Sequence, residues 1–501
     1  MDKQKELGNI SVRFVSILGA IVVIGLIMVL VMSGRGGTTG EGGENVVARE
    51  SETDVATAMP KETVTPAVKS LTAELDVPTL LRQLEQQLEE AGVGPVEPVA
   101  EIDEAKLALG QVLYFDKELS GNRDISCATC HHPTLASGDG RSLSLGTGAV
   151  GLGEQRQLGY GRSLIPRHAP DVFNRGDSRW DTMFWDGRIN GHVETGFDNP
   201  ANEELLPGLD NILAVQAMFP VTSRDEMRGD LGDSDIYGQR NELADFYNDD
   251  WQKMWTAIMK RLLAIPEYQE MFAAAYPDVP QEELTFVHAA NAIAAFEIDA
   301  FTFTDSPWDE YLAGDGNALT EEQVRGAWLF FGPAGCAGCH NGPLLTDQQF
   351  YNLGVPQLGP GKGNPDGFDF GRFLETEMVE DQYRFRTPPL RNVTETGPWM
   401  HNGAYSTLEG VIRHHLDPVN SLLNYEASEL ERLVQLSFDP YRDMVLLTTA
   451  DVEPTLLNQK PLSEEDIAYI IAFLESLTSP SLDRLEGTLP ESVPSGLPIT
   501  D

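Results

Sequence analysis

Two short stretches, CATCH at residues 127–131 and CAGCH at residues 336–340, determine what this chain is built around. Both have the spacing C-x-x-C-H, which is the attachment signature of c-type haem. Two thiols separated by two residues can each bond to one vinyl group of the ring, and the adjacent histidine can ligate the iron. The pattern therefore predicts two covalent haems, one held by Cys127, Cys130 and His131 and the other by Cys336, Cys339 and His340.

The cysteine count supports this interpretation over its alternatives. The 501 residues contain four cysteines, and all four lie in the two motifs, so a disulfide scaffold is excluded. A zinc site lacks a second Cys pair near either motif, and a thioredoxin-like site lacks the βαβ context. The motifs lie 209 residues apart (336 − 127), and an aromatic-rich helix end precedes each one. We therefore expect one haem domain per motif, related by internal duplication.

The charge of the chain limits its partners. Asp and Glu number 78 and Lys and Arg 35, which gives a formal net charge of −43 at pH 7. Such a surface repels phosphates, which excludes nucleic acid as a partner, and it favours a basic soluble protein. The same acidity also keeps a protein soluble in a salty medium. A hydrophobic fraction of 41% is too high for a disordered chain.

The N-terminal region predicts export from the cytoplasm. Residues 14–32 are a run of 19 residues without a charge, which nearly spans a hydrocarbon core of ~30 Å at ~1.5 Å per residue. Basic residues precede the run and place the N-terminus in the cytoplasm. No A-x-A cleavage site follows Met32. We expect an uncleaved transmembrane anchor on the periplasmic side of the bacterial inner membrane, with a cleaved signal and a soluble periplasmic protein as the alternative.

Apolar periodicity predicts a mostly α fold with long loops rich in Gly and Pro. The expected helices are 71–92, 243–263, 282–296, 321–331, 407–415 and 463–477. The last of these begins with a capping box of Ser463 and Asp466. The expected organisation is an anchor or signal over 1–35, a flexible linker over 36–70, cytochrome c-like haem domains over 71–300 and 301–480, and a loose tail over 481–501.

Two classes of function remain open at this point. One is a dihaem electron carrier or redox sensor in which both irons have six ligands. The other is an enzyme in which one iron is open to a small molecule. The number of distal ligands separates the two classes. The chain has nine His, two of which are the predicted proximal ligands, and we expect His288 to pack within an Ala-rich helix.

Further segments between residues 100 and 480 carry a family resemblance. They are LGQVLYFDKELS before the first motif, FWDGR at 184–188, SPWDEYLAGD at 306–315, RGAWLFFGPAGCAGCHNGPLLTD around the second motif and RTPPLRNVTETGPWMHNGAYSTLEGVIRHH at 386–415. In their order and content they resemble the bacterial dihaem cytochrome c peroxidases, and within them the MauG-like branch. The resemblance implies that the first haem reacts with peroxide and that the second delivers electrons.

The resemblance also implies that the first haem is open on its distal side. Many members carry a distal His about 16 residues after the His of the first motif, and that position is Thr147 here. The MauG-like branch has a Gln, a Pro and a Glu in the distal pocket, and Gln216, Pro220 and Glu226 match their spacing. Glu226 would then act as a general acid–base on peroxide, and Gln216 would hold the bound oxygen. From the sequence alone, Glu226 is one acidic residue among 78.

Two further family features map onto this chain. Trp185 in FWDGR matches a Trp that lies between the haems and offers a route for electrons. Thr396 and Pro398 match two ligands of a Ca²⁺ ion between the domains, but the position of its Asn ligand is His168 here. Imidazole is a poor ligand for calcium, so Ca²⁺ binding requires water and haem propionates to complete the shell.

The second haem is expected to have two imidazole ligands. In the family its distal ligand lies 14 residues after the His of an HDG-like motif, and here His401 begins that motif, which points to His415. His414 lies ~100° away around the helix, so both cannot face one iron. Met400 is the third candidate. The alternative is that His414 and His415 are surface imidazoles near a helix C-terminus, where positive charge is favoured.

The resemblance thus implies an oxidoreductase that reduces hydrogen peroxide, with electrons reaching the first haem through the second haem and Trp185. The donor would be a soluble c-type cytochrome or a cupredoxin. The first alternative is a MauG-like enzyme that oxidises Trp or Tyr side chains of a partner protein. The second is a dihaem electron carrier or redox sensor without enzyme activity. The sequence makes no prediction about oligomeric state.

Overall fold

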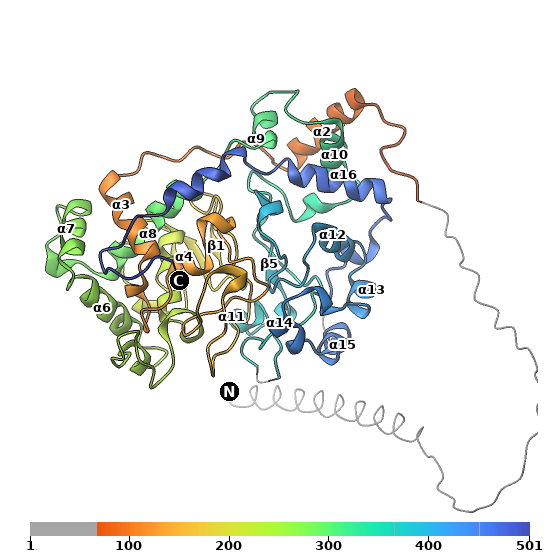
Figure 1. Ribbon diagram of the computed structural model, residues 1–501. Helices are drawn as coiled ribbons and strands as arrows, with labels where there is room; N and C mark the ends of the chain where they lie inside the picture. Colours follow the sequence, from red (N-terminus) through yellow and green to blue (C-terminus); the bar gives the residue numbers. More distant parts are fainter. Residues whose placement is uncertain (1–67, 365, 450, 501) are drawn as a thin grey trace, which may run out of the picture. The chain divides into compact units, whose positions relative to one another are not determined.

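The computed structural model describes residues 68–364, 366–449 and 451–500 (Figure 1). The expected membrane span over 14–32 and most of the expected linker lie outside the described residues. Within the described ranges, no helix combines the length and the apolar character needed to cross a membrane. The described residues belong to a compact unit that runs from Pro66 to Asp501.

The unit is mostly helical, as the apolar periodicity predicted. Its α-helices are α2 (Val77–Glu90), α3 (Glu104–Phe115), α4 (Cys127–Cys130), α5 (Ile212–Ala217), α6 (Trp251–Leu262), α7 (Pro266–Ala275), α8 (Phe286–Phe301), α9 (Pro307–Leu312), α10 (Glu321–Phe331), α11 (Phe373–Thr376), α12 (Leu408–Leu416), α13 (Pro418–Leu423), α14 (Arg432–Ser437), α15 (Pro440–Thr449) and α16 (Glu464–Glu475). Short 3-10 turns lie between them, among them η1 (Lys117–Leu119), η5 (Pro220–Thr222), η9 (Cys336–Gly338) and η14 (Pro480–Thr488).

Two small antiparallel sheets complete the secondary structure. The first has the order β1 (Thr182–Met183), β2 (Ile189–His192) and β3 (Gly196–Asp198), and the second joins β4 (Phe350–Tyr351) to β5 (Phe385–Arg386). In the second sheet Phe350 lies opposite Arg386, and Tyr351 lies opposite Phe385. These strands bring segments on both sides of the long loop 352–384 next to each other.

The unit has a first half, built on the core that contains α3 and α8, and a second half, built on the core that contains α10 and α16. The two halves repeat one helix crossing. In the first half α3 crosses α8 at Gly110, where an added Cβ would lie 1.8 Å from the carbonyl oxygen of Ala292. In the second half α10 crosses α16 at Gly326, where an added Cβ would lie 1.8 Å from the carbonyl oxygen of Tyr469 (Figure 1). The close approach of each pair requires glycine. In each crossing the first helix precedes a CxxCH motif and the second follows it, which agrees with the expected internal duplication.

The second core takes in a helix that comes early in the chain. We expected residues 71–300 to belong to the first haem domain. Helix α2 instead packs beside α10 (Figure 1), and its Leu80, Leu84 and Leu88 are buried in the core that contains Phe330 and Phe473. The spacing of four residues gives α2 a single apolar stripe. The stripe is buried against the second half, although α2 precedes the first half in sequence.

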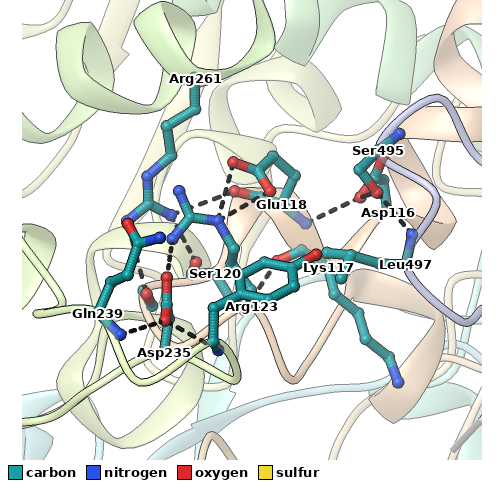
Figure 2. Close-up of polar contacts among 12 residues, drawn as sticks. Asp116, Lys117, Glu118, Ser120, Arg123, Asp235, Gln239, Arg261, Ser495 and Leu497 are labelled. Carbon is teal, nitrogen blue, oxygen red and sulfur yellow. Dashed lines mark hydrogen bonds and ion pairs between the residues drawn. The ribbon is translucent and has the colours of Figure 1, made fainter. Parts of the chain in front are cut away.

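The C-terminal segment is also placed differently from our expectation of a loose tail over 481–501. Leu485 and Val493 are buried in the core of the first half. The hydroxyl of Ser495 donates to Asp116 Oδ1 at 2.7 Å (Figure 2), and the hydroxyl of Tyr268 donates to the other oxygen of the same carboxylate at 2.7 Å. The tail is therefore tied to the start of η1, just before the first CxxCH motif.

Helix boundaries follow local capping more closely than apolar periodicity. The expected helix over 282–296 begins at Phe286, because Thr285 and His288 form a capping box. That contact holds His288 in its helix. The expected helix over 243–263 begins at Trp251, after a 3-10 turn and a loop. The capping box of Ser463 and Asp466 is confirmed, with each side chain bonded to the other residue's backbone N–H.

Candidate active site

The first CxxCH motif faces a single cavity. Helix α4 carries its thiols, Cys127 and Cys130, and His131 follows directly; all three line a cavity of about 390 Å³. The Nδ1 of His131 lies 3.2 Å from the carbonyl oxygen of Ser137. Because a carbonyl can only accept, Nδ1 donates and Nε2 is left as the ligating atom, an arrangement typical of metal-binding His. The hydroxyl of Tyr114 donates to the carbonyl of His131 at 2.7 Å and fixes the backbone.

Three predicted distal residues line the same cavity. Gln216 lies in α5, Pro220 begins η5, and Glu226 lies in a π-helical turn over Arg224–Arg228. Asn211 caps α5, since its side chain accepts from the N–H of Ala214 at 2.9 Å. This run of short turns brings residues that are ten positions apart to one cavity (226 − 216).

The electrostatic surroundings of Glu226 suit an acid–base group. Burial raises the pKa of Glu226, whereas the positive charges of Arg188 and Lys362 lower it. Arg188 and Lys362 also line the cavity. Burial is the larger effect, so the pKa of Glu226 lies above its usual value. Glu226 can therefore exchange a proton with a molecule in the cavity.

Thr147, at the position where other members have a distal His, is directed elsewhere. Its side chain is buried, and its hydroxyl donates to Asp124 Oδ1 at 2.8 Å. Its backbone N–H donates to the carbonyl of Glu226 at 2.8 Å. The described imidazoles that line the cavity are His131 and His168, and His168 Nδ1 donates to the carbonyl of Arg141 at 2.8 Å. The turn around Thr147 therefore holds the turn that carries Glu226 by a backbone hydrogen bond.

The predicted ligands of the second haem are His340, in the second motif, and His415, in α12. His340 Nδ1 donates to the carbonyl of Leu345 at 3.1 Å, and His415 Nδ1 donates to the carbonyl of Val411 at 2.8 Å. Each ring therefore keeps Nε2 for a ligand. Burial, and next the charge of His415, lower the pKa of His340 to about 4. The charge of His415 thus acts on His340, and ligation of the second iron by these two residues stays a prediction.

The two rival ligands are engaged in other contacts. Both ring nitrogens of His414 are bonded, Nδ1 to the hydroxyl of Tyr405 and Nε2 to the carbonyl of Leu353, each at 2.8 Å. Met400 packs against the apolar cluster that contains Leu143. His414 therefore holds α12 in place and has no nitrogen left for iron.

Trp185 connects the two halves. The indole is buried and lines the first cavity. Its Nε1 donates to the carbonyl of His168 at 2.9 Å, and its own carbonyl accepts from the N–H of Arg386 at 2.8 Å. Arg386 belongs to β5, which pairs with β4 just after the second motif. A short hydrogen-bonded path thus leads from the first cavity to the segment that follows the second haem motif.

The structure adds no ligand set to the calcium prediction. The Thr396 hydroxyl donates to the carbonyl of Val393 at 3.3 Å, and His168 Nδ1 is bonded as described. No group of three or more His, Cys, Asp or Glu that could hold a metal ion occurs among residues the structure describes. Calcium at Thr396 and Pro398 stays a prediction.

Sequence reasoning missed several charged residues at the first cavity. Arg188 was quoted as part of FWDGR without a role, and Lys362 lies in a Gly-rich loop that carries no motif. Glu297 of α8 also lines the cavity; its Oε2 has no hydrogen-bond partner, and burial raises its pKa to about 8. Burying a charged side chain is costly unless it is paired, so such residues draw attention to a site. The local sequence, however, does not show which side chains are buried.

The residues present fit c-type haem at both motifs. All four cysteines are free thiols, as the thioether bonds require. Each motif's His presents Nε2, and the cavity at the first motif is lined mainly by apolar atoms. The fold and these sites define a dihaem c-type oxidoreductase with a cavity at the first motif that is lined by both acidic and basic side chains.

Comparison with known proteins agrees with this class. Residues 104–317 match the family described as di-haem cytochrome c peroxidase. The chain is 30% identical to the methylamine utilization protein MauG of Methylorubrum extorquens over 356 residues, which cover 70% of this chain and 80% of MauG. It is 30% identical to the cytochrome c551 peroxidase of Pseudomonas aeruginosa over 311 residues, which cover 62% of this chain and 71% of that enzyme.

A solved structure supports the fold as well. The crystal structure of a MauG-like protein associated with microbial copper homeostasis superposes with a TM-score of 0.52 at 27% identity, covering 78% of this chain and 94% of that one. The chain belongs to the di-haem cytochrome c peroxidase family, and it is an oxidoreductase with two c-type haems.

Proposed function

We propose that this protein reduces hydrogen peroxide at the first site, using electrons that enter through the second. The observation that carries the proposal is that Gln216, Pro220 and Glu226 line the same cavity as His131, while the side chain of Thr147 is bonded to Asp124. Cys127, Cys130 and His131 would hold the first haem, which would supply redox chemistry at its iron.

The side chains of the cavity would handle the protons. Glu226 accepts a proton from one peroxide oxygen and returns it to the other, so that the O–O bond breaks with water as the leaving group. Gln216 donates a hydrogen bond to the bound oxygen. Overall, hydrogen peroxide takes two electrons and two protons and gives two molecules of water.

The second site would pass electrons to the first. His340 and His415 would hold the iron of the second haem. The proposed route then continues through the β4–β5 pair to Trp185, whose carbonyl is bonded to Arg386. The donor is a soluble c-type cytochrome or a cupredoxin. We place the enzyme on the periplasmic side of the membrane, where c-type haems are attached.

Steady-state turnover tests this proposal. The holoenzyme, purified with both haems, should oxidise a reduced c-type cytochrome with two electrons consumed per peroxide. It should also react with peroxide without prior reduction, because Thr147 stands where the resemblance places a distal His in other members, and its hydroxyl is bonded to Asp124. No cytochrome oxidation and no peroxide loss would refute the proposal.

A second candidate function is oxidation of Trp or Tyr side chains of a partner protein. The pair of imidazoles at the second site favours it, since two His ligands give a lower haem potential than a His and Met pair. A low potential at the second haem favours sharing oxidising equivalents between the haems. Peroxide-dependent modification of a co-purified partner, without turnover of cytochrome, would support this function over the first.

A further inference from the structure

The Gly-rich loop over 359–371 carries one lysine from the second half to the first cavity. Lys362 lines that cavity, and its backbone N–H donates to the carbonyl of Phe368 at 3.1 Å. Arg442 donates to the carbonyls of Gly359 at 3.1 Å and Gly367 at 2.5 Å. Contacts within the second half therefore hold the backbone of this loop, including the backbone at Lys362.

The ammonium group of Lys362 is fixed by a buried carboxylate. Lys362 Nζ lies 2.6 Å from Asp186 Oδ2, and Arg167 Nη1 lies 2.6 Å from the same oxygen. Arg188 Nε lies 3.5 Å from Asp186 Oδ1. The side chain of Asp186 is fully buried. Arg167 is held in addition by Asp369 through two hydrogen bonds, at 2.6 and 2.8 Å.

This network presents positive charge to the cavity. Arg167, Arg188 and Lys362 line the cavity together with Glu226, whereas Asp186 and Asp369, which hold these cations, do not. Lys362 and Arg188 are the cations whose charge acts on Glu226. The carboxylates of the network therefore lie behind the cations as seen from the cavity.

We propose that Lys362 is a positioning residue that keeps Glu226 ionised before peroxide binds, so that a loop of the second half controls the acid–base group of the first. The inference rests on the proposed role of Glu226. A carboxylate must be free of its proton to accept one from peroxide. An ammonium group held beside the cavity stabilises that form by its charge.

The groups that face Glu226 fix the sign of the expected change. Burial and Asp225 favour its protonated form, and Arg188, Lys362 and a hydrogen bond from Ser223 favour the carboxylate. Loss of the Lys362 charge should therefore raise the pKa of Glu226. The peroxide reaction would then require a higher pH.

The titration of Lys362 itself leaves this expectation intact. Burial, Arg167 and Arg188 lower its pKa to about 8, and Asp186 opposes them. Glu375 lies in the same network, and Asp186 and Lys362 act on its pKa in opposite directions. Lys362 is charged below about pH 8 and loses its charge above it. The effect of Lys362 should therefore be confined to the acid limb of the pH profile.

The test compares variants of the holoenzyme that differ in one charge. Lys362→Met removes the ammonium, Lys362→Gln removes the charge but keeps a hydrogen bond to Asp186, and Lys362→Arg keeps the charge. Lys253→Met is the matched control, because Lys253 forms an ion pair with Asp250 and its side chain is largely exposed. For each variant the peroxide reaction is measured against pH. The carboxylic-acid infrared band that is absent in Glu226→Gln is titrated in parallel.

In Lys362→Met and Lys362→Gln we expect the acid limb and the infrared titration to move upward by about one pH unit, with the rate at high pH retained. Lys362→Arg and Lys253→Met should match the wild type. An infrared titration that does not move in either neutral variant overturns the inference. If the wild type fails to consume peroxide, the proposed function fails instead, and the infrared titration still decides the role of Lys362.

Discussion

At the residue scale, the site depends on which polar atoms are already bonded to protein. His131, His340 and His415 each donate Nδ1 to a backbone carbonyl and keep Nε2. In His414, one residue from His415, both nitrogens are bonded. Spacing in the sequence predicted His415, and not His414, as the distal ligand of the second haem. The hydrogen bonds supply a physical reason for that choice.

Exchanging Glu226 for Gln should slow the reaction with peroxide while both haems stay in place. The amide keeps the shape of the side chain but cannot accept a proton, and loss of a positioned acid–base group typically costs ~10²–10⁴-fold in rate. Stopped-flow mixing with peroxide measures the rate, and Glu203→Gln, at an exposed position, is the control. An unchanged rate would remove Glu226 from the mechanism.

Replacing His415 by Ala should abolish the low-spin bis-imidazole signal of the second haem. The matched variant His414→Ala should keep that signal, although it loses hydrogen bonds to Tyr405 and Leu353. Low-temperature EPR of the oxidised protein reads the ligands directly. Persistence of the signal in His415→Ala, together with its loss in His414→Ala, would reverse the assignment.

Some of these residues could be predicted from the sequence and others could not. The CxxCH ligands follow from covalent chemistry at fixed spacing, and Gln216, Pro220 and Glu226 lie within one short segment. The pairing of Lys362 with Asp186 joins residues 176 positions apart. No periodicity or motif encodes such a contact, because it depends on how the two halves pack.

At the element scale, each half contains a pair of helices that cross at a glycine, Gly110 or Gly326, where the backbones lie too close for a side chain. The aromatic residues of α3 and α10 predicted helices that end near each haem motif. Apolar periodicity did not predict that α2 packs on α10, since a stripe of leucines specifies an apolar partner without naming it. Helices α6 and α8 begin at Trp251 and Phe286, later than apolar periodicity predicted, because local turns and caps decide where a helix begins.

Adding a methyl group at the second crossing should destabilise the protein. In Gly326→Ala the new Cβ would meet the backbone of α16, and such overpacking typically costs ~1–3 kcal/mol. Gly316→Ala is the control, because nothing lies within 4 Å of an added Cβ there. Denaturant unfolding of the holoenzyme should place the midpoint of Gly326→Ala below that of the wild type, and that of Gly316→Ala close to it. Equal midpoints for both variants would show that the helices can separate without loss.

At the scale of the whole molecule, charge and connectivity join the two sites. Arg167 in the first half is bonded to Asp369 in the second, and Arg141 pairs with Glu431 across the same boundary. Helix α2 packs on the second core and the C-terminal segment on the first, so each end of the described chain crosses to the other half. These contacts join the halves that carry the two haem motifs, as the proposed electron route through Trp185 requires.

The net charge of −43 leads to a prediction about the electron donor. A field of one sign steers an oppositely charged partner, and salt screens it, since the Debye length falls from ~30 Å at 0.01 M to ~3 Å at 1 M ionic strength. Oxidation of a basic c-type cytochrome should therefore slow by about tenfold or more over this range, whereas an acidic cytochrome should react slowly at low salt and faster at high salt. Hydrogen peroxide is uncharged, so its own reaction with the enzyme should barely respond to salt and serves as the internal control. If the basic cytochrome is oxidised at a rate independent of salt while the acidic one is equally fast, the acidic surface has no part in choosing the donor, and its role is solubility alone.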